Sequence, residues 1–216
     1  MQCKFTKYFN NEIQTWDDVW NQEELFDLVT EIQKTEYYYG VTDFDGAEPS
    51  GMSTVGDGYY LQDRNYFKTV WNWMYDNIPE IQGYILDKHI VNVFAPGQNS
   101  YYHTDNAQYD SWTVIWYANT QWHVDEGGET KFILYSKDYK DFGINTNEDR
   151  DYPYIISVAP IPGRMLLFRG GIQHTATAMR FKTRFTPTWQ FIKPKDGQAL
   201  PEIVQGRDHL IMEQKL

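Results

Sequence analysis

Apolar residues recur at helical spacing in two stretches of the first eighty residues. In residues 17–34, Asn21 can cap a helix and acidic side chains fill its first turn. In residues 64–77 the apolar spacing continues until Pro79, which ends the helix because proline cannot donate the backbone hydrogen bond. The expected apolar faces are Leu25, Leu28, Val29 and Ile32 in the first helix and Tyr66, Phe67, Val70, Trp71 and Met74 in the second.

The hydrophobic pattern changes to short β segments from residue 84 onward. These segments are rich in β-branched and aromatic residues and are separated by turn residues, which is typical of a sandwich or a jelly-roll barrel. The expected strands are 84–94, 112–118, 130–135, 154–158, 165–168 and 183–192.

Polar segments divide the chain around this β region. Glycine and acidic residues dominate 43–58, which we expect to be a mobile loop and a candidate lid over the site, and 136–152 forms a charged insertion. We therefore expect one domain over residues 1–216. It has an N-terminal helical and lid region at 1–83, a jelly-roll core at 84–193 and a C-terminal extension at 194–216.

Composition narrows the class of protein. Hydrophobic residues make up 41% and aromatics 17% of the chain, which excludes a disordered protein. The formal net charge of −11 disfavours nucleic acid as a partner and favours a neutral or basic substrate. With Cys3 as the single cysteine, no intrachain disulfide or thiolate cluster can form. No stretch has the length or apolarity of a leader or membrane span, so we expect a soluble, cytoplasmic protein.

A histidine and a carboxylate stand two positions apart in His103-Thr104-Asp105. In an extended segment such residues point the same way and can meet at one ion. His174, which follows a predicted strand and a Gly-Gly turn, can supply a third ligand. Two imidazoles and one carboxylate on one side of an ion are typical of non-haem iron(II) oxygenases.

A second triplet of the same kind, His123-Val124-Asp125, comes just before Gly127-Gly128 and so is expected in a turn. Spacing alone favours His103 over His123 as a ligand but leaves both open, because short motifs match by chance. His89 and His209 have no carboxylate at ligand spacing, and we expect them to be ordinary polar residues. The large aromatic side chains expected to form wall and core are Trp112, Trp116 and Trp189.

The chain from about residue 91 to 191 resembles the 2-oxoglutarate/Fe(II) oxygenase superfamily, and in particular its prolyl 4-hydroxylase-like branch. An ordered set of motifs carries this resemblance, each weak alone but specific together. They are Ala95-Pro96-Gly97-Gln98, His103-Thr104-Asp105, the segment Thr113 to Asn119, Gly127-Gly128-Glu129-Thr130, Pro162-Gly163-Arg164, Leu167-Phe168, His174, Arg184-Phe185-Thr186 and Trp189. In the order of motifs that the resemblance implies, the metal-binding triplet comes before the strand that contains Thr113. The resemblance therefore points to His103 and Asp105 as the metal ligands.

The resemblance also implies a site for 2-oxoglutarate. A basic residue following the second histidine binds the far carboxylate in this family, which points to Arg184 with help from Thr186 and Tyr117. Many members of the branch have lysine there, so arginine is a departure. Arg180 is the rival anchor, because an even spacing puts it on the same face as Arg184, and we favour Arg184 because Trp189 fixes the register.

The implied fold is mainly β with flanking helices around a double-stranded β-helix, that is, a jelly-roll core. The implied activity is hydroxylation with Fe(II), 2-oxoglutarate and O2, with ascorbate as a reductant, and with release of succinate and CO2. Peptidyl proline is the leading substrate, and a small molecule is the other candidate. Two alternatives remain: a metal-dependent jelly-roll isomerase or hydrolase, for which Arg184 would have no use, and a non-catalytic, cupin-like binding module.

Overall fold

The computed structural model describes residues 3–9, 11–42, 48–54, 61–134 and 154–195. Its strands are β1 Lys4–Tyr8, β2 Ile13–Asp17, β3 Tyr38–Val41, β4 Gly51–Ser53, β5 Ile85–Phe94, β6 Ser111–Trp116, β7 Thr130–Leu134, β8 Tyr154–Val158, β9 Met165–Arg169, β10 His174–Ala176 and β11 Arg184–Ile192. Its helices are α1 Gln22–Gln33 and α2 Asn65–Asn77, with short 3-10 turns η2 Pro79–Ile81 and η3 Val124–Glu126.

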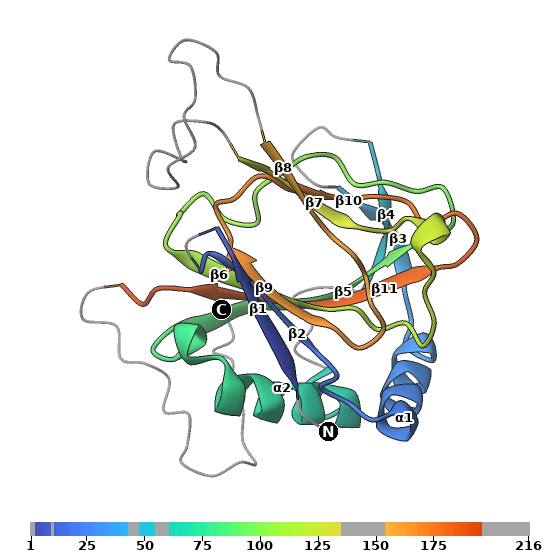
Figure 1. Cartoon of the computed structure of the whole chain (residues 1–216), viewed down its shortest axis with the longest axis horizontal. Helices are drawn as coiled ribbons and strands as arrows, with labels where there is room; N and C mark the ends of the chain where they lie inside the picture. Colours follow the sequence, from blue (N-terminus) through green and yellow to red (C-terminus); the bar gives the residue numbers. More distant parts are fainter. Residues whose placement is uncertain (1–2, 10, 43–47, 55–60, 135–153, 196–216) are drawn as a thin grey trace.

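The strands form two sheets whose neighbouring strands are antiparallel (Figure 1). The large sheet has eight strands in the order β1-β2-β9-β6-β11-β5-β4-β3, and the small sheet has three in the order β10-β7-β8. Neighbours in space are distant in sequence, as β6 lies between β9 and β11. This arrangement confirms the predicted jelly-roll core with flanking helices.

The two helices cover the outer face of the large sheet, and both predictions are confirmed. At the start of α1, Asn21 accepts a hydrogen bond from the backbone N–H of Glu24, whose side chain accepts one from the backbone N–H of Asn21. This reciprocal cap satisfies two N–H groups that a helix start otherwise leaves unpaired. The residues buried by the helices are Leu28, Val29 and Ile32 of α1 and Tyr66, Phe67, Val70, Trp71 and Met74 of α2.

Alternation along the strands divides the core into two apolar clusters. The outer cluster joins the helices to the large sheet and contains Trp112, Trp116 and Trp189, which are 5%, 0% and 0% exposed. Their predicted structural role is confirmed, and burial of each such side chain contributes about 1.5–3 kcal/mol. The inner cluster, which includes Phe132 and Phe168, lies between the two sheets.

The first eighty residues contain strands that the sequence pattern does not predict. Strands β1 to β4 belong to the large sheet, where β2 pairs with β9 and β4 with β5. The loop and lid expected at 43–58 is therefore interrupted at Gly51–Ser53, and most of its other residues lie outside the described ones, as do 136–152 and 196–216. The predicted domain boundaries stay a prediction.

His89 is not the ordinary polar residue that the sequence suggests. It is completely buried in the outer cluster, where its ring stacks on Trp189 at a centroid distance of 4.5 Å. Its nitrogens lie 3.1 Å from the Tyr66 hydroxyl and 3.0 Å from the Thr188 carbonyl oxygen. His89 is thus a hydrogen-bonded core histidine, and His209 lies outside the described residues.

None of the helices among the described residues is both long and apolar enough to cross a membrane.

Candidate active site

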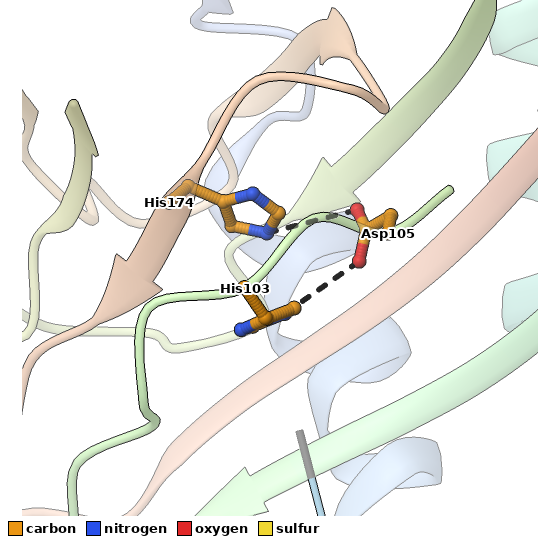
Figure 2. A group of neighbouring side chains, drawn as sticks. All are labelled: His103, Asp105 and His174. Carbon is orange, nitrogen blue, oxygen red and sulfur yellow. Dashed lines mark ion pairs between the residues drawn. The ribbon is translucent and has the colours of Figure 1, made fainter. Parts of the chain in front are cut away.

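Three side chains that the sequence singles out converge between the two sheets. One ligand atom from each of His103, Asp105 and His174 lies within 4.8 Å of the others (Figure 2). The two Nε2 atoms lie 3.7 Å (His103) and 3.6 Å (His174) from the Asp105 carboxylate. The His103, Asp105 and His174 side chains are only 19%, 9% and 6% exposed. Such a cluster, turned away from water, has the ligand number and spacing of a metal centre.

Backbone pairing brings these residues together. The backbones of His103 and His174 form an isolated antiparallel bridge, with N–H donating to C=O at 2.9 Å in both directions. The N–H of Asp105 donates to the carbonyl oxygen of Gly170 at 3.0 Å. A Cβ at position 170 would clash with the Ser111 hydroxyl oxygen, so a larger residue there would displace that hydroxyl. Backbone hydrogen bonds to Gly170 thus hold the segment at residue 105 against the turn before β10.

Hydrogen bonds fix the direction of each ligand. The Nδ1 atoms of His103 and His174 lie 2.9 Å from the backbone oxygens of Tyr101 and Ile172. Since a carbonyl oxygen can only accept, each Nδ1 carries the hydrogen and each Nε2 presents its lone pair to the centre. Thr113 on β6 donates its hydroxyl hydrogen to Oδ2 of Asp105 at 2.7 Å.

The carboxylate is held in its charged form. Burial alone would raise the pKa of Asp105, but the positive charges that His174 and His103 carry when they are protonated, together with the Thr113 hydroxyl, lower it more, to about 2. Asp105 is therefore ionised at neutral pH, as a metal ligand must be. A donor set of two neutral imidazoles and one carboxylate suits Fe(II) and similar divalent ions.

The second triplet lies on the surface. The side chains of His123 and Asp125 are 69% and 79% exposed and form a pair of their own at 3.3 Å. Within the described ranges, the group of His103, Asp105 and His174 is the one that could hold a metal ion. The geometry thus separates two triplets that spacing alone left open.

A buried cation lies at the start of β11. Arg184 is 2% exposed, and its guanidinium donates to the Gly128 carbonyl oxygen at 3.1 Å, the Thr130 hydroxyl at 3.0 Å and the Thr186 hydroxyl at 3.3 Å. No carboxylate of the described residues lies within ion-pair distance of it. Burial lowers the pKa of Arg184, because the charged form loses its water. Its hydrogen-bond partners are neutral, and the nearby charge of Glu129 opposes only part of the effect of burial, so an anionic ligand would offset the remaining cost.

The other residues expected to bind 2-oxoglutarate lie beside Arg184. Tyr117 is fully buried, its ring centroid is 5.4 Å from the guanidinium, and its hydroxyl donates to Thr130 at 2.7 Å. Burial raises the pKa of Tyr117, so the phenol stays neutral. Arg180, the rival anchor, is exposed and its guanidinium lies 5.6 Å from the Phe181 ring centroid.

Sequence analysis missed two residues of this arrangement. The sequence marks Thr113, which donates to Asp105, only as part of an expected strand. Thr130 accepts hydrogen bonds from both Arg184 and Tyr117, and it is 1% exposed. Glu129 and Thr130 are neighbours at the start of an expected strand, so the sequence predicts that one of the two faces the cavity but does not indicate which.

No protein-family model matches the sequence, and no curated protein is significantly similar to it. Solved structures do match. A prolyl hydroxylase of Trichoplax adhaerens, in complex with a peptide fragment of a hypoxia-inducible factor, has 17% identity and a TM-score of 0.53, over 88% of this chain and 83% of that one. A protein of the 2OG-Fe(II) oxygenase family from Burkholderia pseudomallei has 11% identity and a TM-score of 0.55, over 85% and 86%.

The fold is that of the 2-oxoglutarate- and Fe(II)-dependent oxygenases. HygX of Streptomyces hygroscopicus, solved with nickel and 2-oxoglutarate bound, shares it with a TM-score of 0.57 and 11% identity, over 83% of this chain and 82% of that one. The resemblance inferred from the motifs is therefore confirmed at the level of the oxygenase fold.

Proposed function

We propose that the protein is an Fe(II)- and 2-oxoglutarate-dependent oxygenase that hydroxylates its substrate. The observation that carries this is a three-ligand metal group in the same inter-sheet space as a buried arginine without a carboxylate partner. An isomerase or hydrolase with the same ligands would have no use for that arginine. With iron and 2-oxoglutarate bound, the expected chemistry is oxidative decarboxylation to succinate and CO2, coupled to hydroxylation of a substrate carbon.

Each side chain has a defined part in this proposal. His103, Asp105 and His174 hold the iron, and the donor set fits it. Arg184 binds the far carboxylate of 2-oxoglutarate, and a planar guanidinium suits a bidentate contact to that group. Thr186 and Tyr117 supply hydroxyl groups beside it.

Apolar side chains keep water from the metal group. The rings of Phe168 and Phe132 lie 4.6 and 5.8 Å from the His174 ring, centroid to centroid. Both phenylalanines are fully buried. Excluding water in this way strengthens electrostatic contacts and protects a reactive oxidant from side reactions.

We further propose that the substrate is a peptide and that the target residue is proline. The motif resemblance is to the prolyl hydroxylase branch, and one structural neighbour is a prolyl hydroxylase in complex with a peptide. Both points support the proposal through relatives rather than through contacts in this chain.

The test is to load the protein with Fe(II) without oxygen, add 2-oxoglutarate and ascorbate, and measure succinate after air is admitted. A panel of proline-containing peptides is screened by mass spectrometry for addition of one oxygen atom. Reactions without iron or without oxygen are the controls. Absence of succinate under every condition would reject the oxygenase, whereas succinate without any peptide product would reject only the peptide substrate.

Ligand variants locate the metal. His103→Ala and His174→Ala each remove one of three ligands and should lose bound iron, whereas His123→Ala changes a surface histidine and should keep it. Bound iron is measured by elemental analysis after gel filtration. Iron retained by His103→Ala but lost from His123→Ala would move the site to the other triplet.

A further inference from the structure

A row of polar side chains leads away from the metal group along the inner face of the large sheet. Thr113 on β6 is directly opposite Gln190 on β11, and Gln190 is directly opposite Lys88 on β5. Thr113 is the residue whose hydroxyl holds Asp105. Adjacent strands are about 4.8 Å apart, so the backbone of Lys88 lies roughly 10 Å from that of Thr113. A lysine side chain extends roughly 6 Å from its Cα, so its ammonium can reach a substrate beside the metal.

Alternation along the strands determines which face the row occupies. His89 and Trp189 lie in the outer cluster under the helices, stacked on each other. Their neighbours Lys88 and Gln190 must then point the opposite way, because successive side chains of a strand face opposite sides of the sheet. That side is the one on which Thr113 meets Asp105.

The two residues of this row have no partner among the residues that the structure describes. Both are half-buried, yet neither the Lys88 ammonium nor the Gln190 amide has a hydrogen bond or ion pair there. Arg169, at the end of β9, does have a partner, since its guanidinium pairs with the Asp110 carboxylate at 2.9 Å. A half-buried cation that has no partner among the described residues, and whose side chain can reach toward the metal group, is placed to bind an anionic ligand.

We propose that Lys88 and Gln190 bind the primary substrate, and that the peptide carries an aspartate or glutamate close to the residue that reacts. This rests on the proposed function, whose substrate class it narrows. The ammonium would contact the acidic side chain and the amide of Gln190 would bind a neighbouring peptide group. The net charge of −11 favours a basic or neutral peptide at long range, whereas direct contact with Lys88 favours an acidic one. The two effects therefore predict opposite preferences for the charge of the peptide.

Matched peptides distinguish direct contact with Lys88 from long-range electrostatics. The probes are two fluorescently labelled peptides with a central proline that differ only in glutamate or glutamine beside it. Wild type, Lys88→Met and Lys131→Met are compared. Methionine keeps much of the apolar stem but not the charge, and Lys131 is a half-buried lysine on the opposite face of β7 from the inward-facing Thr130. Binding is followed by anisotropy with the zinc-loaded protein, and hydroxylation with the iron-loaded protein.

In wild type and Lys131→Met the glutamate peptide should bind about tenfold more tightly than the glutamine peptide, the effect of one charge-assisted hydrogen bond. In Lys88→Met the two peptides should bind equally. A preference for glutamine, a preference that survives in Lys88→Met, or no saturable binding of either peptide overturns the inference. Hydroxylation of both peptides at equal rates would refute the role of Lys88 and leave the proposed oxygenase function in place. Binding that depends on Lys88, without any consumption of 2-oxoglutarate, would refute the proposed oxygenase function and leave the binding role of Lys88 in place.

Discussion

His89 should make the stability of the fold depend on pH in a way that one substitution can isolate. The ring is completely buried, with Nδ1 donating to the Thr188 carbonyl and Nε2 accepting from the Tyr66 hydroxyl. Burial lowers the pKa of His89 from 6.5 to about 3. The folded protein therefore holds this imidazole neutral under conditions in which the unfolded chain protonates it.

The size of the effect follows from the two pKa values. Between pH 6.5 and about 3 the unfolded chain binds one proton more than the folded protein, so folding stability rises with pH. The slope is about 1.4 kcal/mol per pH unit. The contribution is complete above pH 6.5, and on acidification to about pH 5 roughly 2 kcal/mol of it is lost. This is a sizeable part of a typical stability of about 5–15 kcal/mol.

The assay is urea denaturation of the metal-free protein at about pH 7.5 and pH 5. In His89→Phe the Tyr66 hydroxyl loses its acceptor, which destabilises the fold by a similar amount at both values. The loss on acidification should however be smaller than in wild type by about 2 kcal/mol. His123→Gln, at an exposed histidine, should keep the wild-type loss. An equal loss on acidification in wild type and His89→Phe would refute the reasoning.

Three other predictions concern the 2-oxoglutarate anchor, the support of the metal group and the turn before β7. Arg184→Ala should weaken 2-oxoglutarate binding by about 2–5 kcal/mol in calorimetric titrations, while Arg180→Ala should change it by no more than about 0.5 kcal/mol; the reverse order would reassign the anchor. Thr113→Val removes the hydrogen bond to the Asp105 carboxylate and should weaken iron binding about tenfold, as measured by competition with a chelator. An unchanged affinity for iron would show that this hydrogen bond does not help to hold the metal ligand. Gly128→Ala places a Cβ 2.6 Å from Cγ of Met179 at a φ of +86° and should cost about 1–3 kcal/mol in thermal unfolding, with an unchanged midpoint arguing against strain.

The elements that sequence predicts well are those whose own residues specify them. Helix α2 has its apolar face, and Pro79 directly after it, within one short stretch, and the apolar runs of β5 and β11 are long enough to stand out. Strand β1, in contrast, is exposed along its whole length, and β10 has three residues. Strand β1 shows no alternation of buried and exposed residues, although its partner β2 is the next segment of the chain. Strand β10 pairs with the distant β7, and a local pattern does not contain that partner.

The site shows the same division. Two residues apart in one segment, His103 and Asp105 were predicted from local geometry, but their meeting with His174 depends on a backbone bridge between remote segments. Parity placed Arg180 and Arg184 on one face, yet β11 begins at Arg184, so alternation does not extend back to Arg180. The lack of a carboxylate at ligand spacing excludes His89 from the metal group but does not indicate whether it is exposed or buried. His89 alternates with buried residues of the outer cluster, and that alternation marks it as a core position.

The bridge between His103 and His174 has a consequence for metal identity. Reciprocal backbone hydrogen bonds and the carbonyl contacts at each Nδ1 set the ligands in place through the chain itself. Ligands held by backbone hydrogen bonds present the same three donor atoms to any divalent ion of similar size. Nickel, copper and zinc bind nitrogen and oxygen donors at least as tightly as iron(II) does. Which metal fills the protein is then decided by supply and by the order of encounter, so preparations from different growth media should differ in metal content while sharing one structure.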